Sequence, residues 1–418
     1  MTTKWREMRL GDFVSLQRGH DLPEQDRRPG RVPIIGSFGL TGYHDTVKTK
    51  GPGVTVGRSG ASFGVISFCA EDYWPLNTAL YVTDFHGNDP RFAYYFLKTI
   101  DFSGFNSGSA QPSLNRNFIH PIPVCVPSPG EQRRIAEILA AYDDKIELNR
   151  RMNETLEATA RALFNSWFVN YDPVHAKTVA RRQHPTWSNA QVSRAALPNL
   201  APDIAELFPD HFEESTLGPI PAGWRVGTVG DIGDNPRRSV QPSEITHSTS
   251  YIALEHMPRR CIALSDWGNA DEVASGKFRF CSGEILFGKL RPYFHKVGVP
   301  AIDGVCSTDV LVIVPRVEHW FGPLLGHVSS DAMIAHTDTS STGTKMPRTN
   351  WSDIARFEIA IPPEPIATAA THYIRAIISR IHANIHDSRS LALARDALLP
   401  RLLSGVLKVN ANSIRSQP

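Results

Sequence analysis

Residues 131–168 read EQRRIAEILAAYDDKIELNRRMNETLEATARALFNSWF, and residues 364–404 read EPIATAATHYIRAIISRIHANIHDSRSLALARDALLPRLLS. Both stretches are rich in Ala, Leu, Ile, Glu and Arg and contain almost no internal Gly or Pro. This composition predicts one long helix in each stretch. A helix as long as residues 131–168 would span roughly 57 Å.

Apolar side chains recur along both predicted helices in a 3–4 alternation, which is the pattern of a coiled-coil seam. Such a seam has to be covered by a partner helix. Asn149 and Asn384 occupy equivalent seam positions, where a buried amide fixes register and orientation because it must meet a partner. The predicted seam comprises Ile135, Leu139, Tyr142, Ile146, Asn149, Leu156 and Leu163 in the first helix, and Ile374, Ile377, Ile381, Asn384, Leu391 and Leu398 in the second.

The two helical stretches belong to an internal repeat that covers most of the chain. Asn115 recurs as Asn350, and the same spacing holds without a gap through both helices, to the pair Leu163 and Leu398. At the front of each copy the spacing is shorter, as between Trp5 and Trp224. The second copy therefore carries insertions in its front half, whereas the back half keeps its length and must obey a stricter geometric rule.

The front part of each copy, residues 1–127 and 223–362, consists of short apolar runs punctuated by Gly and Pro. Such runs predict strands, so each front part is expected to be a strand-rich α+β domain. Residues 171–222 lie between the copies, have a Pro-rich, irregular composition and end in a group of acidic side chains. We expect a connector that phosphate would repel and that lies away from any nucleic acid.

The overall composition bounds the function. The 418 residues carry 44 Lys and Arg against 42 Asp and Glu, a net charge of +2, so any nucleic-acid contact must use local charge. Five cysteines lie far apart without a Cys-x-x-Cys pair, which favours reduced thiols over disulfides or a zinc site. No apolar run reaches the roughly 18 residues of a membrane span, and the first residues lack the apolar core of a signal peptide. We expect a cytoplasmic protein.

Motifs for catalysis are absent from the sequence. There is no Gly-x-x-x-x-Gly-Lys-Ser/Thr loop and no Gly-x-Gly-x-x-Gly after a predicted strand. Residues 235–238, Asn-Pro-Arg-Arg, lack the aromatic side chain that would stack on a flipped adenine, and Pro209-Asp210 lacks the following acid-x-Lys of a nuclease core. His382 and His386 are spaced like metal ligands, but we expect them to face solvent. The sequence predicts no catalytic residue and no metal site.

Positive charge is concentrated in the two front parts. Residues 1–60 hold ten Lys or Arg against six Asp or Glu, a net charge of +4, and residues 237–296 hold nine against six, a net charge of +3. Basic pairs neutralise phosphates or contact base edges, and Gly-rich loops let a backbone approach a duplex closely. The candidate DNA-binding residues are Arg58, Ser59, Ser109, Gln111, Asn115 and Arg116 in the first part, and Arg237, Arg238, Lys289, Arg291, Thr344, Lys345 and Arg348 in the second.

Several phrases of the sequence are similar to those of a known family. These are GSAQ at 108–111 leading to LNR at 114–116, PSPGEQRRIA at 127–136, FPDHFEES at 208–215 and LGPIPAGW at 217–224. With the order of domain, helix, connector, domain and helix, they resemble the specificity (S) subunit of type I restriction–modification enzymes over nearly the whole chain.

The resemblance implies an α+β fold with two similar target-recognition domains joined by two long helices. The helices would pack as an antiparallel coiled coil with pseudo-twofold symmetry and set the separation of the two domains. Each domain would read one half of a bipartite, asymmetric site in double-stranded DNA. The implied boundaries are 1–127 for the first domain, 128–170 for the first helix, 171–222 for the connector, 223–362 for the second domain, 363–407 for the second helix and 408–418 for a tail.

The resemblance also implies partners that carry the chemistry. Two methylase (M) subunits would dock on the helices and methylate adenine with S-adenosylmethionine, and restriction (R) subunits would add ATP- and Mg-dependent translocation and cleavage. This chain itself would bind no cofactor and catalyse nothing. Residues 362–367 depart from the family pattern because they lack the Glu-Gln pair of 131–132. We expect this difference to weaken the start of the second helix or its partner contacts.

Two other classes of function remain open from the sequence. One is a coiled-coil scaffold that never touches DNA, which a salt-dependent DNA-binding assay would separate from a DNA-reading subunit. The other is a stand-alone methylase or nuclease with an unrecognised site, which activity of the purified chain alone would reveal.

Overall fold

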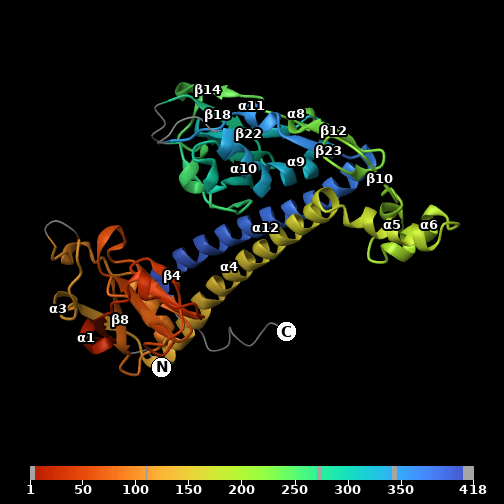
Figure 1. Cartoon of the computed structure of the whole chain (residues 1–418). Helices are drawn as coiled ribbons and strands as arrows, with labels where there is room; N and C mark the ends of the chain where they lie inside the picture. Colours follow the sequence, from red (N-terminus) through yellow and green to blue (C-terminus); the bar gives the residue numbers. More distant parts are fainter. Residues whose placement is uncertain (1–4, 109–111, 271–274, 341–345, 408–418) are drawn as a thin grey trace. The chain divides into compact units, whose positions relative to one another are not determined.

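The computed structural model describes residues 5–108, 112–270, 275–340 and 346–407. The chain forms two compact units (Figure 1). Unit 1 comprises Met1–Ile146 with Ser390–Pro418, and unit 2 comprises Glu147–Arg389. Among the described residues, no helix combines the length and the apolar character that a membrane crossing requires.

Two long helices contribute segments to both units. Helix α4 extends over Pro129–Phe164 and helix α12 over Glu364–Leu403. A π-helical turn, Asn165–Val169, follows α4, so the α-helix ends earlier than the predicted 131–168 while the helical path continues. Pro400 lies inside the last turn of α12 and has no N–H to donate to the carbonyl four residues earlier.

The helix segments within each unit run antiparallel. In unit 2, Asn149 Nδ2 of α4 donates to Asp387 Oδ2 of α12 at 2.8 Å, and Asn384 Nδ2 donates to Asn153 Oδ1 at 2.8 Å. Partner numbers therefore fall along α12 as residue numbers rise along α4. In unit 1, Arg395 of α12 forms an ion pair with Asp143 of α4. The predicted antiparallel pairing of the two long helices is confirmed.

Unit 1 contains three small sheets with short helices between them. The first residues pair with the strand that precedes α4, so the domain closes on itself before the long helix begins. The sheets are β1 (Arg6–Arg9) with β9 (Pro123–Val126); β2 (Ser15–Arg18), β8 (Ala79–Asp84), β5 (Gly53–Gly57) and β6 (Ile66–Cys69) in that order; and β4 (Gly39–His44), β3 (Val32–Gly36) and β7 (Trp74–Pro75). The helices are α1 (Leu10–Phe13), α2 (Pro90–Leu97) and α3 (Arg116–Ile119).

Unit 2 repeats this plan with larger sheets. The sheets are β12 (Arg225–Thr228) with β23 (Glu358–Ile361); β13 (Gly233–Asp234), β22 (Val310–Pro315), β19 (Ile285–Gly288), β20 (Val297–Pro300) and β16 (Ala263–Leu264); and β14 (Ser239–Val240), β18 (Lys277–Phe280), β21 (Gly304–Cys306), β15 (Ser250–Ile252) and β17 (Gly268–Asn269). The helices of this domain are α8 (Val229–Ile232), α9 (Phe321–Val328), α10 (Asp331–Ser340) and α11 (Trp351–Ala355).

The two domains are similar down to strand register. Arg6 lies opposite Val126 in unit 1, and Arg225 lies opposite Ile361 in unit 2. The first members of these pairs are related by the shorter spacing of the sequence repeat, and the second members by the longer one. The prediction of two similar strand-rich α+β domains joined by long helices is confirmed.

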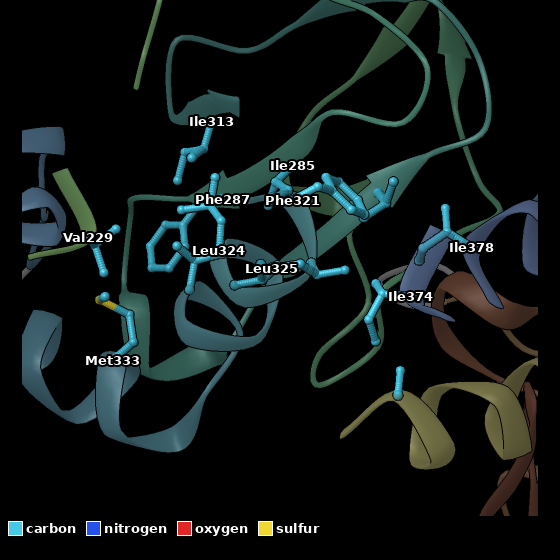
Figure 2. Packing of buried hydrophobic residues seen from close by; sticks show 14 of the residues in the cluster. Val229, Ile285, Phe287, Ile313, Phe321, Leu324, Leu325, Met333, Ile374 and Ile378 are labelled. Atoms are coloured by element: carbon cyan, nitrogen blue, oxygen red, sulfur yellow. The ribbon is translucent and has the colours of Figure 1, made fainter. Parts of the chain in front are cut away.

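Each long helix packs its apolar face into a domain core. In unit 1, Ile135 and Leu139 of α4 and Leu402 of α12 are buried in one cluster with Phe92 of α2. In unit 2, Figure 2 shows Ile374 and Ile378 of α12 in the cluster that contains Phe321, Leu324 and Leu325 of α9. Burial of such side chains contributes roughly 1.5–3 kcal/mol each, so helix and domain form one core in each unit.

Residues 171–222, expected to be a connector, form short helices and strands. Lys177 is fully buried, and its Nζ donates to Asn189 Oδ1 at 2.8 Å and to the Ala205 carbonyl at 3.1 Å. Burial lowers the pKa of Lys177 to about 8. The segment forms α5 (Asp172–Gln183), α6 (Asn189–Ala196), α7 (Pro202–Ala205), β10 (Phe212–Glu213) and β11 (Ile220–Pro221).

The segment is rich in Pro, and two of its prolines lie where helices begin. Pro173 and Pro202 lie in the first turns of α5 and α7, where the missing N–H removes no helical hydrogen bond. Phe208 is buried against Trp167, with ring centroids 5.0 Å apart. A Pro-rich composition is therefore compatible with the short helices of this segment.

Candidate nucleic-acid interface

The end of strand β5 is joined to the segment before α3 by main-chain hydrogen bonds. The Leu114 N–H donates to the Arg58 carbonyl at 2.8 Å, and the Gly60 N–H donates to the Pro112 carbonyl at 3.3 Å. Ser59 lies opposite Ser113 in a β-bridge between these bonds. We call residues 58–60 with 112–114 clamp 1.

The same arrangement recurs in unit 2 at the end of strand β19. The Thr349 N–H donates to the Lys289 carbonyl at 3.0 Å, and the Arg291 N–H donates to the Pro347 carbonyl at 2.8 Å. Leu290 lies opposite Arg348 in the matching β-bridge. We call residues 289–291 with 347–349 clamp 2. Clamp 2 thus joins the predicted residues Lys289 and Arg291 to Arg348, and clamp 1 joins Arg58 and Ser59 to the segment that leads into Asn115 and Arg116.

Clamp 1 borders a polar cavity of about 460 Å³. Arg18, Arg58 and Arg116 belong to its lining. Arg58 Nη1 donates to the Asn77 carbonyl at 3.3 Å, a neutral partner that leaves the charge of the guanidinium uncompensated by that bond. Arg18 is ion-paired with Asp21 at 3.1 Å, and the three arginines give the lining a positive character.

Asn115, the predicted residue that directly follows clamp 1, has a structural role. Asn115 is the N-cap of α3, and its Oδ1 accepts from the Asn117 N–H at 3.0 Å. Asn350 caps α11 in unit 2 in the same way, accepting from the Asp353 N–H at 3.2 Å. The short helix after each clamp is therefore oriented by an equivalent asparagine, which satisfies an otherwise free helical N–H.

The basic residues of clamp 2 differ in their environments. Arg348 Nη2 lies 3.4 Å from Asp309 Oδ1. Arg291 adopts a left-handed backbone conformation with φ of 52°, and its buried Nε has no hydrogen-bond partner among the described residues. The guanidinium carbon of Arg291 lies 5.9 Å from the centroid of the Phe294 ring.

The structure does not bring Arg238 to clamp 2. Arg238 forms an ion pair with Glu284, which raises the pKa of its guanidinium. Glu284 precedes strand β19, whereas Lys289 follows it, so the two sites lie at opposite ends of that strand. Arg237 adjoins this ion pair and has a left-handed backbone with φ of 43°. These two arginines belong to a different surface from the other predicted residues of unit 2.

Four predicted residues lie outside the described residues. They are Ser109, Gln111, Thr344 and Lys345. Their flanking positions belong to the segments that lead into the two clamps.

The predicted seam residues differ in burial along the helices. In unit 1, Ile135 and Leu139 are buried, and Tyr142, Ile146, Leu391 and Leu398 are half-buried. In unit 2, Asn149, Ile374, Ile381 and Asn384 are buried, and Leu156, Leu163 and Ile377 are half-buried. The heptad pattern missed Ile378 and Ile385, which are buried because α12 also packs against its domain.

The seam asparagines form exchange-related contacts. Asn149 Nδ2 donates to Ser388 Oγ at 3.2 Å as well as to Asp387, and Asn384 pairs with Asn153. The sequence repeat relates Asn149 to Asn384 and Asn153 to Ser388, so it exchanges the two contacts. The centre of a local twofold relation lies between them, within the helix segments of unit 2.

Although α12 lacks the Glu-Gln pair of α4, a different side chain attaches it to its domain. Gln132 of α4 is fully buried; its Oε1 accepts from the Asp89 N–H at 3.0 Å and its Nε2 donates to Asn88 Oδ1 at 2.8 Å. In unit 2, Thr371 of α12 attaches the helix to its domain in the equivalent way. Its Oγ1 accepts from the Gly322 N–H at 2.9 Å and donates to the His319 carbonyl at 2.6 Å.

Of the two histidines of α12 expected to face solvent, His386 is exposed as expected, whereas His382 is not. His382 is partly buried, and this burial lowers its pKa. His386 Nε2 lies 3.0 Å from the Ala301 carbonyl. Both contact the domain of unit 2 because α12 packs on it. Within the described residues, no three His, Cys, Asp or Glu side chains gather closely enough to hold a metal ion.

Comparisons with known proteins show which proteins this chain is similar to. The family model of the type I restriction modification DNA specificity domain matches residues 2–158. The chain is 26% identical over 337 residues to the type I restriction enzyme MjaIX specificity subunit of Methanocaldococcus jannaschii, covering 76% of this chain and 69% of the relative. It is 24% identical over 326 residues to the HindI specificity subunit of Haemophilus influenzae, covering 70% and 71%.

A solved structure has the same fold over the full length. It is the type I restriction–modification S subunit from M. genitalium, with a TM-score of 0.57, 13% identity and 96% of each chain covered. The duplicated clamps, the antiparallel helices, the domain match and these relatives lead to one assignment. The chain is similar to type I restriction–modification specificity subunits, and its residues 2–158 match the DNA specificity domain of that family.

Proposed function

We propose that this chain reads a bipartite, asymmetric site in double-stranded DNA, with clamp 1 at one half-site and clamp 2 at the other. The observation that carries the proposal is the identical main-chain framework of the two clamps, which presents different side chains in each. Clamp 1 presents Arg58 and Ser59, whereas clamp 2 presents Lys289 and Arg291. Equivalent frameworks with different side chains suit two half-sites of different sequence.

The helix pair acts as the spacer in this proposal. Helix α4 has 36 residues and would extend roughly 54 Å. Half-sites read from one face of a duplex lie about one turn apart, roughly 34 Å. Helices of this length are sufficient to span that separation, and a spacer with a fixed function explains why the repeat keeps a constant spacing throughout the helices.

Two methylase subunits are the proposed partners of the helix pair. The exchange-related contacts of Asn149 and Asn384 give the pair a local twofold relation, and such a relation lets two identical subunits bind equivalently. These subunits would supply S-adenosylmethionine for adenine methylation, which requires the base to leave the stack. Restriction subunits would add ATP and Mg. The complex would work in the cytoplasm, where its DNA is.

The test combines methylation mapping with one substitution in each clamp. Sequencing of methylated adenines in cells that express this chain with its methylase subunits should give one bipartite motif. Arg58→Ala should then weaken or relax recognition of one half only, and Lys289→Ala that of the other half. A motif without a gap, or a change in the same half for both variants, would refute the assignment of one clamp to each half-site.

Two alternatives make different predictions in the same material. A scaffold that never touches DNA would leave binding of the methylase complex independent of the two clamp substitutions and of salt. A stand-alone enzyme would methylate or cleave DNA without the partner subunits.

A further inference from the structure

An exposed apolar patch lies on the β3–β4 hairpin of unit 1. Phe38, at the tip of the hairpin, is 65% exposed, and Leu40 on β4 is 50% exposed. Val65, between β5 and β6, is 41% exposed. Single exposed apolar side chains are ordinary, whereas an exposed aromatic with apolar neighbours indicates a surface that binds something. We call Phe38, Leu40 and Val65 the hairpin patch.

The hairpin patch adjoins clamp 1. A Cβ on Gly57 would clash with the Ser37 carbonyl oxygen, so the hairpin tip packs directly on Gly57. The Gly57 N–H also donates to the Val65 carbonyl at 2.7 Å. Gly57 is the residue before Arg58, and only a residue without a side chain permits this approach. The hairpin tip and Val65 therefore lie beside the strand end that leads into Arg58, one of the residues that line the cavity.

The chemistry of that surface selects its ligand. Arg58 and Arg116 line the neighbouring cavity and favour phosphate over an apolar protein face. The extended apolar surface of duplex DNA is the faces of its stacked bases, which become accessible when a base step opens. Proteins that insert Phe or Leu at such a step kink the duplex and gain contact area in return.

We propose that Phe38 is a wedge that inserts at a base step of the half-site read by clamp 1, unstacking that step beside the bound phosphates. This inference rests on the proposed function, because it needs the clamp to bind DNA. The wedge would add recognition through the ease with which the DNA deforms, at base pairs that no side chain reads directly.

Clamp 2 offers an independent parallel. Tyr293, two residues after Arg291, is 48% exposed, and Met346, immediately before Pro347, is 55% exposed. An exposed apolar side chain thus accompanies each clamp, although it comes from different elements in the two units. The second half-site would accordingly be deformed at a different place.

The test uses the chain assembled with its methylase subunits and a duplex of the mapped motif. 2-Aminopurine is placed at successive steps of the half-site that Arg58→Ala affects. Wild type should raise its fluorescence at one step, which reports unstacking. Phe38→Ala should abolish that rise and weaken binding roughly tenfold, and Phe38→Trp should restore both.

Tyr43→Ala is the matched control. Tyr43 is an aromatic of the same hairpin and is 54% exposed, but it pairs with Pro33, away from the tip where Gly36 meets Gly39. It should leave fluorescence and affinity unchanged, and thermal melting should show that both variants are folded.

The outcomes separate the wedge from the proposed function. If wild type raises no fluorescence while Arg58→Ala still weakens binding, the wedge is wrong and clamp 1 still reads DNA. If Phe38→Ala instead releases the methylase subunits with DNA affinity unchanged, the patch is a protein-docking surface and the wedge is overturned. If neither variant changes DNA binding, the proposed function fails as well.

Discussion

The two units fasten their long helices to their domains with different side chains at different positions. In unit 1, Gln132 of α4 bonds to the backbone at the start of α2. In unit 2, Thr371 of α12 bonds to the backbone at the start of α9. The repeat aligns Gln132 with Ala367, so the function moved from that position to the next turn of the same helix face. In both units a side chain of the long helix binds the backbone at the start of a domain helix. The side chain that does so differs between the units.

The largest expected effect concerns the helix pair that both units share. Inserting one heptad between Arg151 and Met152 of α4, and one between Ile385 and His386 of α12, lengthens the pair by roughly 10 Å. Because the insertions lie opposite each other in the antiparallel register, the contacts of Asn149 and Asn384 are retained on their own sides. The mapped motif should gain about three base pairs of spacer.

Insertion into one helix alone is the control for this experiment. It removes the antiparallel register on one side, so recognition or assembly should be lost. A double insertion that leaves the spacer unchanged at full activity would remove the spacer role of the helices.

The attachment in unit 1 should be the stronger one. Gln132→Leu keeps the volume but leaves the Asp89 N–H and the Asn88 amide without their buried partner. We expect local stability at the start of α2 to fall by about 3 kcal/mol, since each unsatisfied buried group costs about 1–3 kcal/mol. Hydrogen exchange of the α2 amides measures this directly. Exchange rates equal to wild type would show that Gln132 only fills space.

The attachment in unit 2 should be weaker because Thr371 makes two hydrogen bonds, whereas Gln132 makes a third one to the Pro127 carbonyl at 2.9 Å. Thr371→Val leaves the Gly322 N–H and the His319 carbonyl unpaired. We expect a loss of about 1–2 kcal/mol at the start of α9, again measured by hydrogen exchange. The amides of α2 serve as an internal reference. A larger loss here than for Gln132→Leu would reverse the comparison.

The seam asparagines should give the smallest and most unequal effects. Asn384→Leu leaves Asn153 buried without its partner, and we expect a loss of about 1–2 kcal/mol. Asn149→Leu removes the hydrogen-bond partner of Asp387 and Ser388, but water reaches both of these side chains. The free energy of unfolding should therefore change by less than about 0.5 kcal/mol. Denaturant unfolding of the two variants side by side decides this. Equal losses would show that the exchange-related contacts are energetically equivalent.

The sequence predicted the periodic parts of the fold and missed the parts set by single contacts. Both long helices and the similarity of the domains followed from heptads and constant spacing, because those patterns reflect backbone geometry. The helices and strands of residues 171–222 were not predicted, because this segment lacks the periodic apolar pattern of the long helices. The role of Thr371 was missed because a single threonine belongs to no periodic pattern in the sequence.

The candidate site was predicted in part for the same reason. Basic residues and paired loops indicated where DNA would bind, but not that Arg58 joins Leu114 or that Lys289 joins Thr349. Those contacts depend on which strand end meets which later segment, and local composition does not encode that. Arg238 was grouped with the clamp because charge was counted without its partner Glu284.

Both clamps are held by main-chain hydrogen bonds, and this has an evolutionary consequence. Residues 58–59 and 289–290 can exchange their side chains without losing the bonds that position them. Under the proposed function, folding and target choice are therefore uncoupled at these positions. A lineage could drift to new DNA targets through point mutations there, one half-site at a time, while the shared scaffold stays intact.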